Sequence, residues 1–204
     1  MGSQKTILIG LPNSTGDTKN DWSAMLSGIC MYLTVKGYNV EIIVVDRSLI
    51  EIARNTIIEI AQEKKKDWVF FLDDDTYVEI DAVWKMIQLD KDICSPPVAD
   101  RKGEKQLNVL NEGLNRVYEV EKTEKVTAIG MACTLIKCDV SNSLLKEYAT
   151  PFEFGNVSLD GKKIPVGEDV NFCLRAGAKG YETWCIKGIK TWHRGEPKKY
   201  TYEG

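Results

Sequence analysis

The stretch Phe70–Thr76 (FFLDDDT) places three consecutive carboxylates directly after residues that favour burial. With the two residues before it, the apolar run becomes Trp68–Leu72 (WVFFL), which is apolar on both faces of an extended chain and therefore predicts a central strand. The three acids repel one another, and no lysine or arginine lies within the stretch to offset them. Such a cluster is tolerated either because water solvates it fully or because it binds a cation. The stretch alone leaves both explanations open.

Strand and helix patterns alternate around this segment. The predicted strands are Lys5–Leu11, Val40–Val45, Trp68–Leu72 and Ile93–Ser95, and the predicted helices begin at Asp21, at Ser48 and at Ala82. Ser48 and Glu51 match the capping-box pattern of a helix start. Successive strand–helix units of this kind predict an α/β fold with a parallel sheet and right-handed crossovers.

The second half of the chain is less regular. It predicts a long strand broken by Gly130, a helix capped by Asp139, a loop with a tight turn, a short helix, a last strand and a basic, aromatic tail. The corresponding ranges are Val126–Lys137, Leu144–Tyr148, Pro151–Val166 with its turn at Asp160-Gly161, Glu168–Ala178, Tyr181–Ile186 and Lys187–Gly204.

Length, charge and cysteine spacing narrow the class of protein. The 204 residues fit one domain, and the net charge of -3 provides no basic field for nucleic acid or an anionic membrane. The sequence shows no transmembrane segment and no signal peptide pattern. The six cysteines form no CxxC pair, which favours buried, reduced thiols over disulfides or a zinc site. We therefore expect a cytoplasmic protein.

The three acids follow the most buried strand, at the end where open parallel sheets bind ligands. If the chain stays extended, Asp73 and Asp75 face one side, with Asp74 between them on the other. Such a pair suits Mg²⁺ or Mn²⁺ together with the phosphate oxygens of a substrate. A solvated acidic turn is the alternative.

Two further signals are weak when taken singly. The sole histidine, His193, follows the last predicted strand, and a lone histidine is more often structural or exposed than a ligand. Glu168 and Asp169 begin a helix, where acids are expected because of the helix dipole alone.

Together, the order of these segments resembles the family 2-like glycosyltransferases of the GT-A fold, which use nucleotide-diphospho-sugars. The resemblance rests on ARNTIIEIAQEKKKDWVFFLDDDTYV, AIGMACTLI, GEDVNFCLRAGAKGY and the late His-Arg-Gly, and it spans nearly the whole chain. It implies one GT-A (Rossmann-like) domain, with a mixed, mostly parallel central sheet flanked by helices. Residues 1–98 would then form the nucleotide-binding half, and residues 99–204 the acceptor and metal half.

The resemblance also implies roles for individual residues. Asp73 and Asp75 match the ends of the family's DxD motif, which holds the metal and the ribose, and Asp74 is counted with the nucleotide-binding residues. The other matched positions are Pro12 and Asn13 near the base, Arg54 near the nucleotide, His193 on the metal, and Glu168 with Asp169 in the xED motif. In that motif, the aspartate is the general base of inverting members.

The implied activity is metal-dependent transfer of a sugar, with Mn²⁺ or Mg²⁺ as cofactor and a UDP-sugar as the favoured donor. The acceptor is open among a glycan, a protein, a lipid and a modified nucleobase, and so is the choice between inversion and retention. A haloacid-dehalogenase-like phosphatase is a poorer match, because Tyr77 stands at its expected threonine. Sugar-nucleotide pyrophosphorylases need a Gly-rich, Arg-containing loop that is missing here. A non-catalytic nucleotide- or sugar-binding module is the remaining alternative.

Overall fold

The strand that the acids follow lies inside a seven-stranded sheet, as its sequence predicts. The computed structural model describes residues 4–13, 20–99, 107–159, 161–193 and 201–202. Over these residues the strand order of the main sheet is β2-β1-β3-β9-β5-β12-β7. The bounds are β1 Thr6–Asn13, β2 Asn39–Asp46, β3 Trp68–Leu72, β5 Ile93–Ser95, β7 Glu124–Val126, β9 Cys133–Lys137 and β12 Thr183–Cys185.

The main sheet is mixed but mostly parallel. β2, β1, β3, β5 and β12 run in one direction, and β9 and β7 run in the other. Because five strands share a direction, their carboxyl ends meet at one edge of the sheet. The expected α/β class and Rossmann-like architecture are confirmed.

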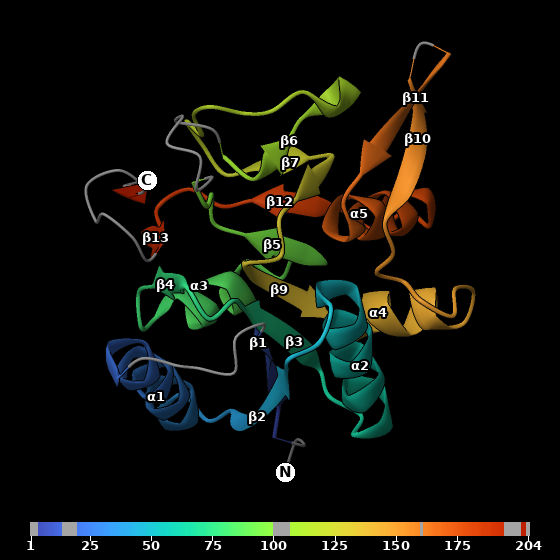
Figure 1. The fold of residues 1–204 in the computed structure, drawn as a ribbon. Helices are drawn as coiled ribbons and strands as arrows, with labels where there is room; N and C mark the ends of the chain where they lie inside the picture. The colour runs from blue at the N-terminus through green and yellow to red at the C-terminus, as the bar shows by residue number, and fades with distance from the viewer. Residues whose placement is uncertain (1–3, 14–19, 100–106, 160, 194–200, 203–204) are drawn as a thin grey trace.

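Helices cover both faces of this sheet (Figure 1). Helices α1 (Asn20–Val35) and α3 (Ala82–Gln88) lie on one face, whereas α2 (Ile50–Glu63), α4 (Cys138–Leu145) and α5 (Glu168–Ala178) lie on the other. Successive side chains of β3 point to opposite faces, so Phe70 packs into the cluster beneath α1 and Phe71 into the cluster beneath α2. Both phenylalanines are fully buried. The double-sided burial explains why Trp68–Leu72 is apolar throughout.

Several local predictions are wrong. Helix α2 begins after Leu49 and shows no side-chain cap, so Ser48 and Glu51 form no capping box. Asp139 does not cap a later helix; it lies in the first turn of α4, which is preceded by Lys137. The long strand predicted around Gly130 is divided into β7, β8 (Ala128–Ile129) and β9.

The segment predicted as a loop before α5 is a β-hairpin. Strands β10 (Gly155–Leu159) and β11 (Lys162–Val166) pair with each other, and the hairpin extends beyond α5 (Figure 1). Gly161 has a φ of +75°, as a tight turn requires, whereas Asp160 lies outside the described residues. The remaining short elements are β6 (Val109–Leu110) and the 3₁₀ turn η1 (Glu112–Leu114).

A small second sheet holds part of the tail. Strand β13 (Thr191–His193) lies between β4 (Thr76–Val78) and β14 (Thr201–Tyr202), and both pairings are antiparallel. The strand Tyr181–Ile186, predicted to be the last, is therefore followed by two more. Across the β4–β13 pair, Trp192 stacks on Tyr77, with ring centroids 5.6 Å apart.

Two other expectations concern the chain as a whole. All six cysteines are free thiols, and all but Cys30 are buried. In the part of the chain that the structure describes, none of the helices combines the length and the apolar character that a membrane span requires.

Candidate active site

The three acids lie where β3 reaches the carboxyl edge of the main sheet. The Asp73 N–H donates to the carbonyl of Ala132, 2.9 Å away, which keeps this residue beside β9. The chain then turns, because the Thr76 N–H donates back to the Asp73 carbonyl at 3.1 Å. The extended course assumed for Asp73 to Asp75 is therefore wrong. As a consequence of the turn, Asp73 and Asp75 contact different partners.

Asp73 contacts a buried arginine on α2. Arg54 Nη2 lies 3.4 Å from Asp73 Oδ1, and Arg54 Nη1 donates to Glu168 Oε1 at the start of α5. The side chains of Arg54, Glu168 and Asp73 are 5%, 8% and 21% exposed. One guanidinium thus joins α2, the end of β3 and the beginning of α5. It supplies the positive charge that two neighbouring carboxylates need when water is scarce.

Burial changes the acidity of Glu168. Loss of solvent raises the pKa of this carboxyl above its ordinary value, and the negative charges of Asp169 and Asp73 raise it further. The Arg54 guanidinium acts in the opposite direction but does not cancel the increase. Glu168 therefore serves as a partner of Arg54 within the protein, in a poorly solvated position.

Asp75 contacts the sole histidine. Because β13 pairs with β4 in a register that puts His193 opposite Thr76, the imidazole returns to the turn after β3. His193 Nδ1 lies 3.6 Å from Asp75 Oδ1 and 3.4 Å from Thr76 Oγ1. His193 is 5% exposed, so the ring is held by the small sheet and does not move freely in water.

Asp169 lies in the first turn of α5, next to Glu168. Its Oδ1 accepts the Val170 N–H at 2.7 Å, which fixes the orientation of the carboxylate. A Cβ at position 167 would come within 2.7 Å of the same oxygen, so Gly167 leaves the room that this orientation needs. Asp169 also lines a cavity of about 220 Å³.

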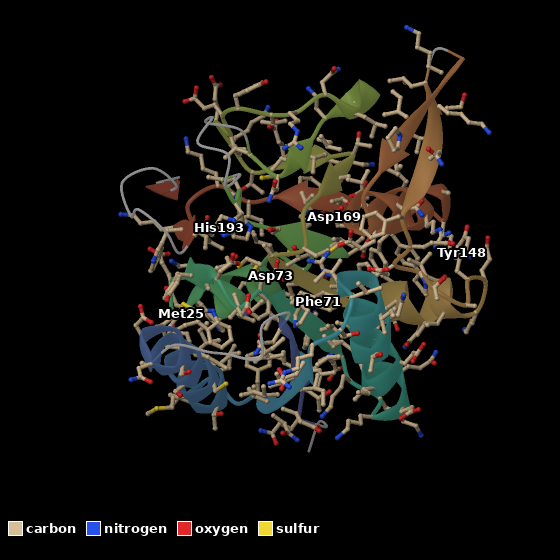
Figure 2. All side chains as sticks on the ribbon, in the orientation of Figure 1. Met25, Phe71, Asp73, Tyr148, Asp169 and His193 are labelled. Atoms are coloured by element: carbon tan, nitrogen blue, oxygen red, sulfur yellow. The ribbon has the colours of Figure 1, made fainter. Side chains whose placement is uncertain are left out.

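The remaining predicted residues lie at the same edge. Pro12 and Asn13 end β1, the strand beside β3, and both are buried; the Arg47 N–H donates to the Asn13 carbonyl at 2.8 Å. Asp74 is half-buried in the turn between β3 and β4. Figure 2 shows Asp73 between His193 on one side and Asp169 on the other. The fold thus brings the predicted residues to one region of the molecule.

The metal ligands inferred from the family resemblance are only partly together. Asp75 and His193 are neighbours, whereas Asp73 is engaged by Arg54. Among the described residues there is no group of three or more His, Cys, Asp or Glu side chains that could hold a metal ion. An Mg²⁺ or Mn²⁺ site with one or two protein carboxylates is completed by substrate phosphates and water. The Asp75–His193 pair fits such a substrate-dependent site.

Sequence reasoning overlooked Thr76 and the strand that it begins. Thr76-Tyr77-Val78 consists of β-branched and aromatic residues, the composition of a short strand, and this signal was available. Asn108 and Arg116, which share the cavity with Asp169, carried no recognisable pattern.

Comparison with known proteins gives a fold but no family. No protein-family model matches the sequence, and none of the curated proteins matches it. A solved glycosyltransferase involved in the glycosylation of the major capsid of PBCV-1 aligns with a TM-score of 0.35 and 14% identity over 70% of this chain and 66% of that one. The crystal structure of A197 from STIV aligns with a TM-score of 0.62 and 16% identity, covering 98% of this chain and 94% of that one. This chain therefore has a fold similar to that of A197 over nearly its whole length.

Proposed function

We propose that the protein is a metal-dependent glycosyltransferase that moves a sugar from a nucleotide-diphospho-sugar, with UDP as the favoured nucleotide, to an acceptor hydroxyl. One observation carries the proposal. The buried Arg54–Glu168 pair connects Asp73, at the donor end of β3, to Asp169 at the start of α5. This pair supports the proposal because it ties the turn that carries the proposed cation ligands to the helix start that carries the proposed base.

On the donor side, Asp75 and His193 would hold Mn²⁺ or Mg²⁺, and Asp73 lies next to them in the same turn. The ion, when bound, supplies Lewis-acid stabilisation of the negative charge that develops on the departing diphosphate. Pro12 and Asn13, at the end of the neighbouring strand β1, are the proposed contacts for the base. Arg54 holds Asp73 in place.

On the acceptor side, Asp169 is the better candidate for the general base. A hydroxyl that attacks the sugar must lose its proton, and a carboxylate within hydrogen-bond reach can accept it. Glu168 is less suited to this role, because its carboxylate is buried and engaged by Arg54. We therefore propose that Glu168 positions Arg54 and that Asp169 accepts the proton if the reaction inverts the anomeric carbon.

Calorimetry of UDP binding with and without Mn²⁺ tests the donor site. We expect binding to require Mn²⁺, and we expect Asp75→Ala to abolish most of it because the cation loses a ligand. Asp139→Ala removes an exposed carboxylate of α4 and should leave the affinity unchanged. Equal UDP affinity in the presence and absence of Mn²⁺ would contradict the proposal of a metal-dependent donor site.

Slow hydrolysis of a nucleotide sugar in the presence of Mn²⁺ separates a transferase from a binding module, because transferases often pass the sugar to water. Asp169→Asn should lower transfer by about 10²- to 10⁴-fold while UDP binding stays nearly intact. A loss of UDP affinity of the same size would make Asp169 a binding residue.

We also propose a cytoplasmic location, since the six cysteines are free thiols. Cell fractionation tests this proposal.

A further inference from the structure

Helix α1 carries almost no charge, although it lies at the periphery of the molecule (Figure 1). Its sequence, NDWSAMLSGICMYLTV, contains one charged side chain, Asp21 in the first turn, and the next charge along the chain is Lys36. By contrast, α2 has charged side chains at four of its 14 positions, as is usual for a helix in contact with water. Packing within the described part of the chain does not explain the lack of charge on α1, because much of the helix is exposed.

The inner side of α1 is fixed to the fold, and this determines which side faces outward. Trp22 Nε1 donates to the Thr76 carbonyl at 3.0 Å. The buried stripe consists of Trp22, Leu26, Ile29 and Leu33. The exposed positions after the first turn, which we call the outer face of α1, are Ala24, Ser27, Met31, Thr34 and Val35. Met31 and Val35 are 70% and 85% exposed.

The two hydroxyl groups of the outer face are bonded within the helix itself. Ser27 Oγ donates to the Ser23 carbonyl, and Thr34 Oγ1 donates to the Cys30 carbonyl, both at 2.8 Å. A hydroxyl that already has a partner loses less when water is removed from it. Another apolar surface can therefore cover the outer face at a small cost.

Strand β2 extends this uncharged surface. Val40 packs into the cluster beneath α1, so the alternation of side chains places Ile42 and Val44 on the same side of the sheet as α1. Both side chains are exposed, and β2 is in contact with α1. Among the described strands, β2 is at one end of the main sheet, so no strand covers it from outside.

The outer face is complementary to itself. Ala24, Ser27, Met31 and Thr34 recur three and four residues apart, the spacing of the contact positions of two packed helices. If two copies of α1 pack antiparallel, Ser27 lies opposite Met31 of the second copy, and Ala24 lies opposite Thr34. A small side chain then meets a larger one at each level, as the two-fold interface of a dimer requires.

The charges at the two ends of α1 favour the same orientation. Antiparallel packing brings Asp21 of each copy towards Lys36 of the other, whereas parallel packing brings like charges together. Within the chain, Asp21 accepts the Trp22 N–H. Lys36 lies over the rings of Tyr32 and Trp84, with Nζ 5.3 and 4.6 Å from their centroids. These contacts do not change the sign of either charge, and the sign decides which orientation is favoured.

We propose that the outer face of α1, together with Ile42 and Val44, is a dimer interface at which α1 packs antiparallel against α1 of a second copy of this chain. The complementarity of size and of charge along one helix identifies a second copy as the partner. This inference does not depend on the proposed glycosyltransferase function.

Sedimentation velocity at protein concentrations of roughly 1–100 µM, where a weak dimer dissociates, tests the proposal. We expect the wild type to change from monomer to dimer as the concentration rises. Met31→Glu should weaken the association by at least about a hundredfold, because it buries a charge in the interface. Ile52→Glu makes the same change at an exposed apolar residue of α2, on the other side of the sheet, and should have no effect. Circular dichroism checks that both variants are folded.

Disulfide cross-linking tests the orientation. In a Cys30→Ser background, which removes the half-buried thiol of α1, copies with Ser27→Cys are mixed with copies with Met31→Cys and oxidised. We expect a cross-linked dimer from the mixture and little from either variant alone, because Ser27 faces Met31 in the antiparallel register. Cross-linking of each variant with itself would contradict that register.

Two results would overturn the dimer proposal. One is a wild type that stays monomeric at every concentration, and the other is an equal association of the wild type and Met31→Glu. Cosedimentation with phosphatidylcholine vesicles identifies the other class of partner. If a monomeric wild type binds these vesicles and Met31→Glu does not, the outer face belongs to a membrane contact and not to a dimer.

Discussion

Asp73 and Asp75 are separated by one residue, but they belong to two differently built parts of the site. Asp73 is tied through Arg54 to Glu168, so its partners come from α2 and α5, which pack on the main sheet. Asp75 faces His193, which a three-residue strand outside the main sheet carries back to the turn.

The difference separates a charge pair that is compensated within the protein from the pair that we propose as a cation site. Arg54 and Glu168 compensate each other inside the protein and need no ligand. Asp75 and His193 are the pair that we propose to hold a cation whose coordination is completed by substrate oxygens. Changes on the Arg54 side should therefore affect stability first, whereas changes on the His193 side should affect ligand binding first.

The largest effect is expected for Arg54→Ala. The substitution leaves Glu168 and Asp73 close together without their cation, and loss of one partner of a buried ion pair costs about 3–5 kcal/mol of unfolding free energy. Urea unfolding at pH 7 measures it. The deficit should shrink at lower pH, because protonation removes the uncompensated charges.

Arg54→Lys is the control for this prediction. Lysine keeps the charge but lacks the planar fork that contacts two carboxylates, so its loss should be smaller than that of alanine. Equal losses for the two variants would show that packing around Arg54, and not its charge, stabilises the protein.

The next largest effect is expected for His193→Gln. Loss of the imidazole should weaken UDP binding in the presence of Mn²⁺ by at least about tenfold, by analogy with the cost of losing a conserved metal-site contact. Without Mn²⁺ the unfolding free energy should change less than it does in Arg54→Ala. A stability loss as large as that of Arg54→Ala, with unchanged UDP affinity, would make His193 a structural residue.

A smaller effect is expected for Thr76→Val, which preserves shape but removes the hydroxyl next to His193 Nδ1. The loss should be about 0.5–1.5 kcal/mol, the net value of one hydrogen bond. Thr134→Val is the matched control, since its buried hydroxyl donates to the Gly130 carbonyl at 2.9 Å, away from His193. Both variants should lose stability in urea, but only Thr76→Val should weaken Mn²⁺-dependent UDP binding. Equal effects of the two variants on UDP binding would argue against orientation of His193 by Thr76.

The smallest expected effect is a change in how the unfolding free energy depends on pH when Glu168 is replaced. Because burial raises its pKa in the folded state, the stability that this group contributes is fully present below its unfolded pKa and is lost as pH rises through its folded pKa. Glu168→Gln should remove that part of the decline in a series of urea titrations at increasing pH.

Glu41 provides a control of opposite sign. Hydrogen bonds from Lys64 and Lys66 lower its pKa, so its contribution is present above the unfolded pKa and is lost as pH falls. Glu41→Gln should therefore flatten the acid side of the profile, whereas Glu168→Gln flattens the side towards neutral pH. A Glu168→Gln profile parallel to that of the wild type would contradict the assignment.

The predictions from sequence were accurate for those elements whose faces are clearly either buried or exposed. Trp68–Leu72 and Glu168–Ala178 have the predicted bounds, because burial on both faces of a strand and on one face of a helix leaves a regular apolar pattern. The hairpin of β10 and β11 was missed because its strands are largely exposed and, within the part of the chain that the structure describes, pair only with each other. Without a buried face, no period of apolar residues marks a strand.

The positions of the candidate site residues were predictable, but their pairing was not. Asp73, Arg54 and Glu168 meet because α2, the end of β3 and the start of α5 lie together, and the family resemblance pointed to all three. The turn that begins at Asp73 and the β4–β13 register decide that Asp73 contacts Arg54 and that Asp75 contacts His193. Both are tertiary features that carry no signature in a single sequence.

The small sheet of β4, β13 and β14 has a consequence for inactivation by heat. Strand β13 is joined by a few backbone pairs to β4 and β14, which have only three and two residues, whereas β3 lies inside the main sheet. Elements with few partners open locally at a lower free energy than the core. His193 should therefore leave the site at temperatures at which the main sheet is still folded. Mn²⁺-dependent activity and native circular dichroism should consequently disappear at different temperatures, with activity the first to be lost.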